Sequence, residues 1–271
     1  MFKIACKEAL KYTRPIIIGK KYYQNDQIFN DIATLIVLNQ YGDILATKEV
    51  AEYFLTAKDT NEIFNKILNE IKSQNNRQIK KTENKYGLNK NTITNVELQI
   101  IDVAKSISNL EIIFHKYLNL AIIKSQNKDL LIKSYPKFYN GNYYQAESIL
   151  GLGYPFPEYE TFMFDSETNK ILTTCKRMNF PSFPISGMIT RNILDEQNEV
   201  SQFEISNQIY RGMSGGPILN KNGQVLGIMS ANKTIIENEK TSTTLGIVIN
   251  SNEIIKFLKE NNIECEVINE K

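Results

Sequence analysis

One serine of the chain lies in a run of glycines, a setting in which a hydroxyl can act as a nucleophile. Residues 211–219 read RGMSGGPIL, so Ser214 is preceded by Gly212 and followed by two further glycines. Glycine permits the sharp backbone turn and the close approach of substrate that a catalytic loop requires. In such a turn, the N–H groups of Gly212 and Ser214 can point at one spot and stabilise a developing oxyanion. The segment therefore predicts a candidate nucleophile with an oxyanion hole formed by Gly212 and Ser214.

The elements that must position this serine are mostly short strands. Apolar and β-branched runs alternate with Gly and Asn turns, which is typical of an all-β barrel or sandwich. We expect strands at residues 16–18, 33–38, 43–46, 110–114, 120–124, 130–132, 148–151, 185–190, 202–205, 216–219, 225–229 and 245–249. A helix at 252–258 is expected to close the chain.

A stretch of different character, residues 56–109, interrupts the strand pattern. Residues 59–72 place apolar side chains at helical spacing, and Asp59 or Thr60 could be the N-cap. The apolar face of this helix would comprise Ile63, Phe64, Ile67, Leu68 and Ile71. We expect residues 73–91, which are rich in Lys, Asn and Gln, to form a solvated loop. A second helix is expected from Val96 to Ile107.

Composition excludes several classes of function. The 271 residues carry a net charge of +2, so the sequence predicts no nucleic-acid partner. No apolar run is long enough to cross a bilayer, and we expect no membrane association. Three distant cysteines without metal-ligand spacing predict reduced thiols, no metal, no cofactor and a cytoplasmic location. The first residues lack the unbroken apolar stretch of a signal peptide.

The glycine-rich serine block resembles the G-x-S-G-G-P block of trypsin-like serine proteases, closest in style to the HtrA-type bacterial branch. Other segments resemble that family in the same order along the chain: 41–47 (YGDILAT), 120–124 (LAIIK), 150–155 (LGLGYP), 187–190 (GMIT) and 245–250 (LGIVIN). The resemblance covers nearly all of the chain except the insert. It implies two six-stranded antiparallel β-barrels, spanning 1–135 and 136–271, with a helical insertion at 56–109 in the first and a C-terminal helix.

The chain departs from that family at two of the three catalytic positions. Alignment on the family's T-A-x-H block puts Glu49 where the family has histidine. The aspartate that precedes the family's L-A strand is Asn119 here. The matching triad therefore reads Glu49, Asn119 and Ser214, and only the nucleophile position is retained.

A serine nucleophile needs a base within about 3 Å, and three substitutes remain open. The single histidine, His115, could be a displaced base, or it could be an ordinary loop residue. Glu49 could serve if burial raised its pKa, and Lys48 could form a Ser–Lys pair if it lost its charge. Loss of the base typically costs about a millionfold in turnover. The residues therefore favour an inactive pseudoprotease.

A protease cleft that has lost catalysis can still bind a peptide. The resemblance implies that Ser230, Ala231 and Asn232 pair with a substrate backbone by strand addition. It also implies that Gln208 forms the floor of the primary specificity pocket, where an uncharged group disfavours Lys or Arg side chains. Three functions follow: a peptide- or protein-binding pseudoprotease within a larger assembly, an active serine endopeptidase whose displaced base is switched on by a partner, and an adaptor acting through the insert.

Overall fold

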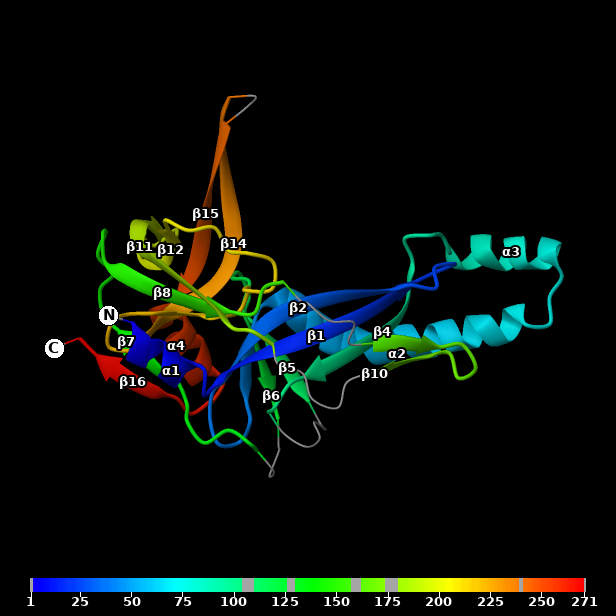
Figure 1. Ribbon diagram of the computed structural model, residues 1–271, viewed down its shortest axis with the longest axis horizontal. Helices are drawn as coiled ribbons and strands as arrows, with labels where there is room; N and C mark the ends of the chain where they lie inside the picture. The colour runs from blue at the N-terminus through cyan, green and yellow to red at the C-terminus, as the bar shows by residue number, and fades with distance from the viewer. Residues whose placement is uncertain are drawn as a thin grey trace.

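The chain folds mostly into β-structure, in two curved antiparallel sheets (Figure 1). The computed structural model describes residues 2–103, 110–125, 130–156, 162–173, 180–238 and 241–270. No helix within these ranges is both long and apolar enough to span a membrane.

The first sheet is a six-stranded half-barrel rather than the expected closed barrel. Its strands lie in the order β4-β1-β2-β3-β6-β5, and the two edge strands, β4 and β5, do not pair with each other in the described ranges. The bounds are β1 (Thr13–Tyr22), β2 (Ile28–Val37), β3 (Ile44–Ala46), β4 (Ile93–Ile100), β5 (Glu111–Phe114) and β6 (Ala121–Lys124). Helix α2 (Lys48–Ile71) contacts β4, β5 and β6, and its buried Val50 and Ala51 join the apolar core of this sheet. The helix thus packs where a closed barrel would place strand against strand.

The second sheet contains a closed barrel, as the sequence predicts for this half of the chain. Strand β13 pairs with both β8 and β14, which joins β13-β8-β11-β12-β15-β14 into a ring of six. Two further strands, β7 and β16, extend this sheet in parallel, and β9 and β10 form a separate hairpin. The bounds are β7 (Lys137–Asn140), β8 (Ser148–Gly153), β9 (Phe162–Asp165), β10 (Lys170–Thr173), β11 (Phe183–Leu194), β12 (Val200–Ile205), β13 (Pro217–Leu219), β14 (Val225–Asn238), β15 (Thr241–Asn250) and β16 (Glu266–Asn269). The β14–β15 hairpin projects well beyond the barrel (Figure 1).

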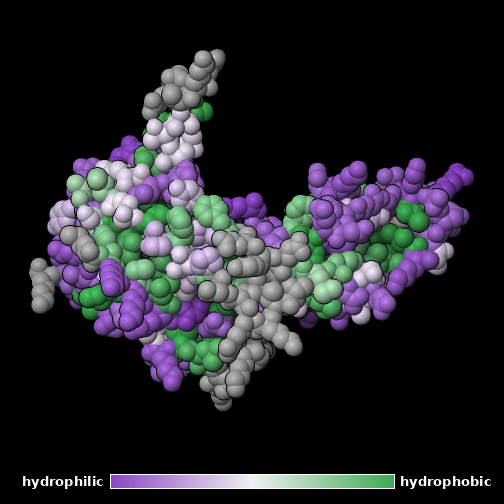
Figure 2. All heavy atoms as spheres, in the orientation of Figure 1, coloured by the Kyte–Doolittle hydropathy of each residue, from purple (hydrophilic) through white to green (hydrophobic). Residues whose placement is uncertain are grey.

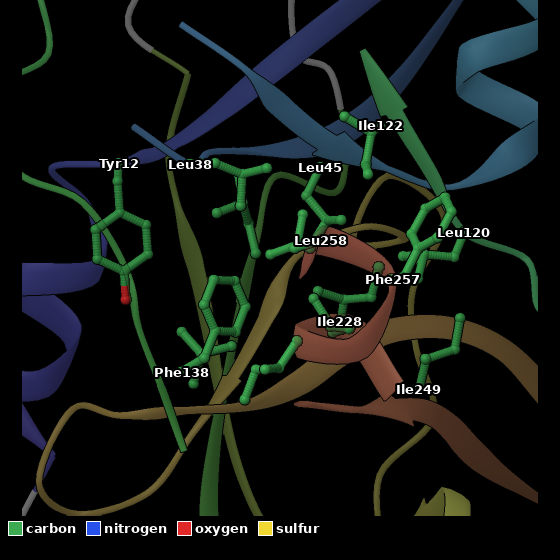
Figure 3. Close-up of a cluster of buried hydrophobic side chains, with 14 of the residues drawn as sticks. Tyr12, Leu38, Leu45, Leu120, Ile122, Phe138, Ile228, Ile249, Phe257 and Leu258 are labelled. Atoms are coloured by element: carbon green, nitrogen blue, oxygen red, sulfur yellow. The ribbon is translucent and has the colours of Figure 1, made fainter. Parts of the chain in front are cut away.

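A single apolar cluster joins the two sheets (Figure 3). Leu38, Leu45 and Leu120 come from the half-barrel side, and Phe138 and Ile228 from the closed barrel. Helix α4 (Ser251–Glu260) adds Phe257 and Leu258 to the same cluster, while α1 (Lys3–Ala9) packs at its edge through Ala9. The two halves therefore share one core.

The insert differs from its sequence prediction in both helices. Helix α2 begins at Lys48 with Thr47 as its N-cap, eleven residues before the expected start, and Ile63 of the predicted apolar face is exposed. The expected loop contains α3 (Asn76–Tyr86), which begins in a capping box formed by Asn75 and Gln78. Both helices extend away from the barrels as an arm whose visible face is largely hydrophilic (Figures 1 and 2). The capping box was visible in the sequence as N-x-x-Q and was missed.

The second expected helix is instead strand β4. Val96, Leu98 and Ile100 alternate along a strand that pairs antiparallel with β1, Ile16 facing Ile100 and Lys20 facing Val96. Val96 and Ile100 also fit a helical spacing of four residues, and pairing with β1 decides for the strand. The strand expected at residues 130–132 does not form. Residues 104–109, the end of the predicted helix, lie outside the described ranges.

Candidate functional site

A cavity at the predicted site lies between the two sheets and has a volume of about 660 Å³. Ser214 and Glu49 both line it, so the structure brings together two residues 165 positions apart in sequence. Its walls come from β1 and β2, the start of α2, the loop that carries Ser214, and β14. The α2 wall comprises Glu49, Val50, Glu52, Tyr53 and Thr56.

Three backbone positions of the Ser214 loop require glycine. Gly212 has φ of +100° and Gly215 has φ of +86°, a region that residues with a Cβ rarely adopt. A Cβ on Gly215 would lie 2.2 Å from the Thr34 carbonyl oxygen, and one on Gly216 would lie 2.2 Å from the Leu152 carbonyl oxygen. The glycine pattern therefore reflects a tight turn pressed between β2 and β8.

Thr34 of β2 anchors this loop to the half-barrel. Its amide N–H donates to the Ser214 carbonyl oxygen over 3.1 Å, and its hydroxyl donates to the Gly212 carbonyl oxygen over 2.7 Å. The same hydroxyl accepts from the Tyr154 N–H at 3.1 Å. Thr34 is fully buried, so these bonds are shielded from competing water.

The N–H groups of Gly212 and Ser214 have no acceptor among the described residues. By contrast, the N–H of Met213 donates to the Tyr210 carbonyl oxygen at 2.9 Å, and the N–H of Gly215 donates to the Met229 carbonyl oxygen at 2.7 Å. Two unpaired donors therefore alternate with two paired donors along a loop that borders a cavity. A carbonyl or carboxylate oxygen in the cavity could accept from both.

The Ser214 hydroxyl donates to a backbone carbonyl rather than to a base. Its Oγ lies 3.1 Å from the Ser230 carbonyl oxygen, at the irregularity where β14 shifts register against β15. An amide carbonyl cannot take the proton that a serine must lose to become a nucleophile. This bond stabilises the neutral hydroxyl.

Asn119 lies at the start of α2, beside the residue that precedes Glu49. The Asn119 Oδ1 accepts from the Lys48 N–H at 2.9 Å, and Lys48 immediately precedes Glu49. Glu49 itself is exposed and has no ion pair among the described residues. Asn119 is not among the residues that line the cavity. Its role here is to satisfy one of the free N–H groups of the first helical turn.

His115 lies outside the cavity as well. Its Nδ1 accepts from the N–H groups of Tyr117 and Leu118, at 3.2 and 3.0 Å, and its ring packs edge-on against Phe257 of α4. Burial lowers the pKa of His115, and the positive charge of Lys48 lowers it further. The nitrogen that could act as a base is therefore engaged within its own loop.

The predicted substrate-binding residues divide into two groups. Ser230, Ala231 and Asn232 line the cavity on the β14 wall, whereas Gln208 is exposed and does not line it. The Asn232 side chain holds the loop before Ser214, since its Oδ1 accepts from the Ile209 N–H at 2.8 Å and its Nδ2 donates to the Ile209 carbonyl oxygen at 2.7 Å. Asn232 thus shapes the wall that it lines.

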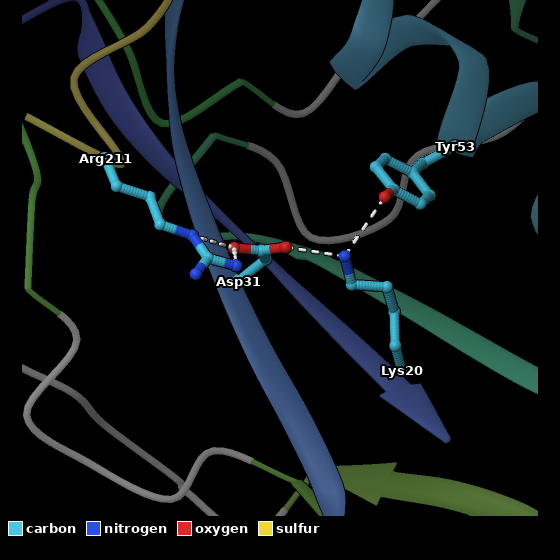
Figure 4. Close-up of polar contacts among 4 residues, drawn as sticks. All are labelled: Lys20, Asp31, Tyr53 and Arg211. Carbon is cyan, nitrogen blue, oxygen red and sulfur yellow. Dashed lines mark hydrogen bonds and ion pairs between the residues drawn. The ribbon is translucent and has the colours of Figure 1, made fainter. Parts of the chain in front are cut away.

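A polar network missed by the sequence analysis borders the cavity (Figure 4). Asp31 of β2 receives the Lys20 ammonium at 2.5 Å on one oxygen and the Arg211 guanidinium on the other, with Nε at 2.8 Å. The Lys20 ammonium also donates to the Tyr53 hydroxyl at 3.1 Å. Burial alone would lower the pKa of Lys20, but its hydrogen bonds to Asp31 and Tyr53 outweigh burial and raise it. The network ties α2 and the Ser214 loop to one half-buried carboxylate.

No cluster of three or more metal-ligating side chains occurs within the residues described. Cys6 and Cys265 are free thiols whose pKa burial raises, and Cys175 lies outside the described ranges. No known protein-family model matches the chain. No curated protein matches it in sequence either.

Proposed function

We propose that this chain is a trypsin-like pseudoprotease, a catalytically inactive member of that fold that binds an extended peptide or protein segment in the Ser214 cavity. The observation that carries the proposal is the bond from the Ser214 hydroxyl to the Ser230 carbonyl oxygen, in a cavity that His115 does not line. A serine without a base retains a small fraction of triad activity. In this proposal the cavity is a binding site.

The free edge of β14 supports strand addition as the binding mode. β13 pairs with β14 only as far as Ile228, and from Ala231 to Asn238 the only strand beside β14 in the described ranges is β15. A peptide placed on that edge would gain main-chain hydrogen bonds along its length. The unpaired N–H groups of Gly212 and Ser214 would then receive one of its carbonyl oxygens.

The position of Asn119 also supports the resemblance to trypsin-like proteases. In that family the aspartate position adjoins the histidine position, and here Asn119 bonds the residue that precedes Glu49. The free thiols of Cys6 and Cys265 fit the proposed cytoplasmic location, where cysteines stay reduced.

An array of randomised immobilised octapeptides tests this function. Binding is expected for the unmodified chain and, undiminished, for Ser214→Ala, because binding needs no nucleophile. Ala231→Trp should abolish binding by filling the cavity wall on β14. The matched control, Ser242→Trp, adds the same bulk to β15 of the same hairpin outside the cavity and should bind normally. Absence of binding to every peptide would refute the proposal.

A further inference from the structure

Three carboxylates line the Ser214 cavity, and they differ in how they are neutralised. Asp31 already has two cationic partners, Lys20 and Arg211. Glu49 and Glu52 have no ion-pair partner among the described residues. The negative charge available to a ligand therefore lies on the α2 wall.

Glu49 and Glu52 are three residues apart on α2 and so lie on one face of the helix. Both are exposed, and Tyr53 continues the same wall with its hydroxyl already engaged by Lys20. The β14 wall of the same cavity, Ser230 to Asn232, carries no charge. A peptide lying on β14 would thus share the cavity with the two carboxylates.

Thr47 supplies a second and independent sign of a missing polar partner. It is fully buried, it lines the same cavity, and its Oγ1 has no hydrogen-bond partner in the described ranges. As the N-cap of α2 its hydroxyl would ordinarily accept from the first turn, but no such bond is formed. A buried hydroxyl left unpaired is unfavourable, and a polar group of an occupant of the cavity would give it a partner.

We infer that the peptide bound in the cavity carries a Lys or Arg side chain, held by Glu49 and Glu52 on the α2 wall. The inference rests on the proposed function and names the ligand chemistry of that same site. Along an extended peptide every second side chain points to the same side, so one on β14 can direct a basic residue at α2. An ammonium or guanidinium group offers several donors to the two carboxylates. Glu49, at the position of the catalytic histidine, thereby becomes a recognition residue.

This specificity differs from the one that Gln208 predicts. Gln208 is an uncharged residue at the expected pocket floor, yet it is exposed and away from the cavity. Selection for a basic side chain would come from α2, on the other side of the serine loop.

Three pools of labelled octapeptides test the inference by fluorescence anisotropy. The pools are randomised except for one central position, fixed as lysine, norleucine or glutamate. The lysine pool should bind most tightly and the glutamate pool most weakly. The difference should shrink as salt rises from about 0.05 M to 0.5 M, because salt screens exposed charges.

Matched variants test whether Glu49 and Glu52 cause the preference for the lysine pool. Glu49→Gln and Glu52→Gln should each weaken binding of the lysine pool about two- to fivefold, as expected for one exposed ion pair. Glu62→Gln, an exposed glutamate on α2 outside the cavity, should change nothing. The double variant Glu49→Lys/Glu52→Lys should reverse the preference toward the glutamate pool.

The outcomes separate the inference from the function on which it rests. Equal binding of all three pools would overturn the basic-peptide inference and leave the peptide-binding function standing. A lysine preference that survives both glutamine variants would also overturn it. Failure of every pool to bind would refute the proposed function and the inference together.

Discussion

The Ser214 hydroxyl lies in a glycine-rich loop of the kind that carries a nucleophile. It donates to the Ser230 carbonyl oxygen, which cannot act as a base. Its neighbours Gly212 and Gly215 adopt positive φ, and the N–H groups of Gly212 and Ser214 have no acceptor among the described residues. The tight turn follows from local glycine constraints, so the sequence predicts it well. The ion pairs of Asp31 could not be predicted, because Arg211 is 180 residues away in sequence and only the fold brings the two together.

The buried, hydrogen-bonded carboxylate of Glu204 should make the stability of the closed barrel depend on pH. Its buried carboxylate accepts from Arg191, which lies opposite it on β11, and from Lys233 on β14 at 3.2 Å. The hydrogen bond from Arg191 is the main cause that lowers the pKa of Glu204 below its ordinary value. The ionised form therefore stabilises the fold above the unfolded pKa of about 4.3, and this contribution is lost as pH falls through the folded-state pKa.

Glu204→Gln should lower the free energy of unfolding at pH 7 by about 1–3 kcal/mol, as for a hydrogen bond to a charged group. The difference from the unmodified chain should shrink as the pH falls below the unfolded pKa of about 4.3 and should disappear once the pH is below the folded-state pKa. Urea unfolding at several pH values measures this. A deficit that stayed constant from pH 7 to pH 3 would show that the charge of Glu204 is not responsible.

At the scale of elements, the start of α2 is the feature on which the site depends. The helix places Glu49 and Glu52 on the cavity wall, and it begins where Asn119 accepts from the Lys48 N–H. Its apolar residues between 59 and 72 predicted a helix, but the residues before Asp59 gave too little periodicity to predict its true start. The sequence predicts a helix where β4 lies, because Val96 and Ile100 fit the period of a helix as well as that of a strand. The partner strand β1, which decides for the strand, lies more than 70 residues earlier in the chain.

Asn119→Ala should destabilise the fold by about 1 kcal/mol, because it leaves the Lys48 N–H without an acceptor. Asn119→Asp should be at least as stable as the native chain, since it keeps the acceptor and places a negative charge at a helix N-terminus. Thermal unfolding of the two variants, followed by circular dichroism, makes the comparison. Equal stability of Asn119→Ala and the native chain would mean that Asn119 does not hold the start of α2.

At the scale of the whole molecule, the two sheets behave as one unit because they share a core and a hydrogen-bonded junction. The short strands and glycine turns predicted a barrel or a sandwich, and the resemblance to trypsin-like proteases implied the closed second barrel. The sequence did not predict the open first sheet, because closure there depends on how α2 packs against β4, β5 and β6. Thr34 lies at the junction, where one hydroxyl bonds both Gly212 and Tyr154.

Thr34→Val should cost about 2–6 kcal/mol, because it leaves a buried carbonyl and a buried N–H unpaired at about 1–3 kcal/mol each. Thr34→Ser retains the hydroxyl and should cost less. Since the chain has no tryptophan, tyrosine fluorescence and far-ultraviolet circular dichroism would follow urea unfolding. Both probes should report one coincident transition. Two separate transitions would contradict a shared core.

The central claim, that Ser214 is not an activated nucleophile, is tested most directly by fluorophosphonate labelling. The purified chain, Ser214→Ala and His115→Ala would be treated side by side at neutral and acidic pH. We predict no labelling of any of the three at either pH, because within the described part of the chain the Ser214 hydroxyl has only the Ser230 carbonyl oxygen as its acceptor. Labelling of the native chain that disappears in Ser214→Ala would contradict the account, and its loss in His115→Ala as well would identify the histidine as the base.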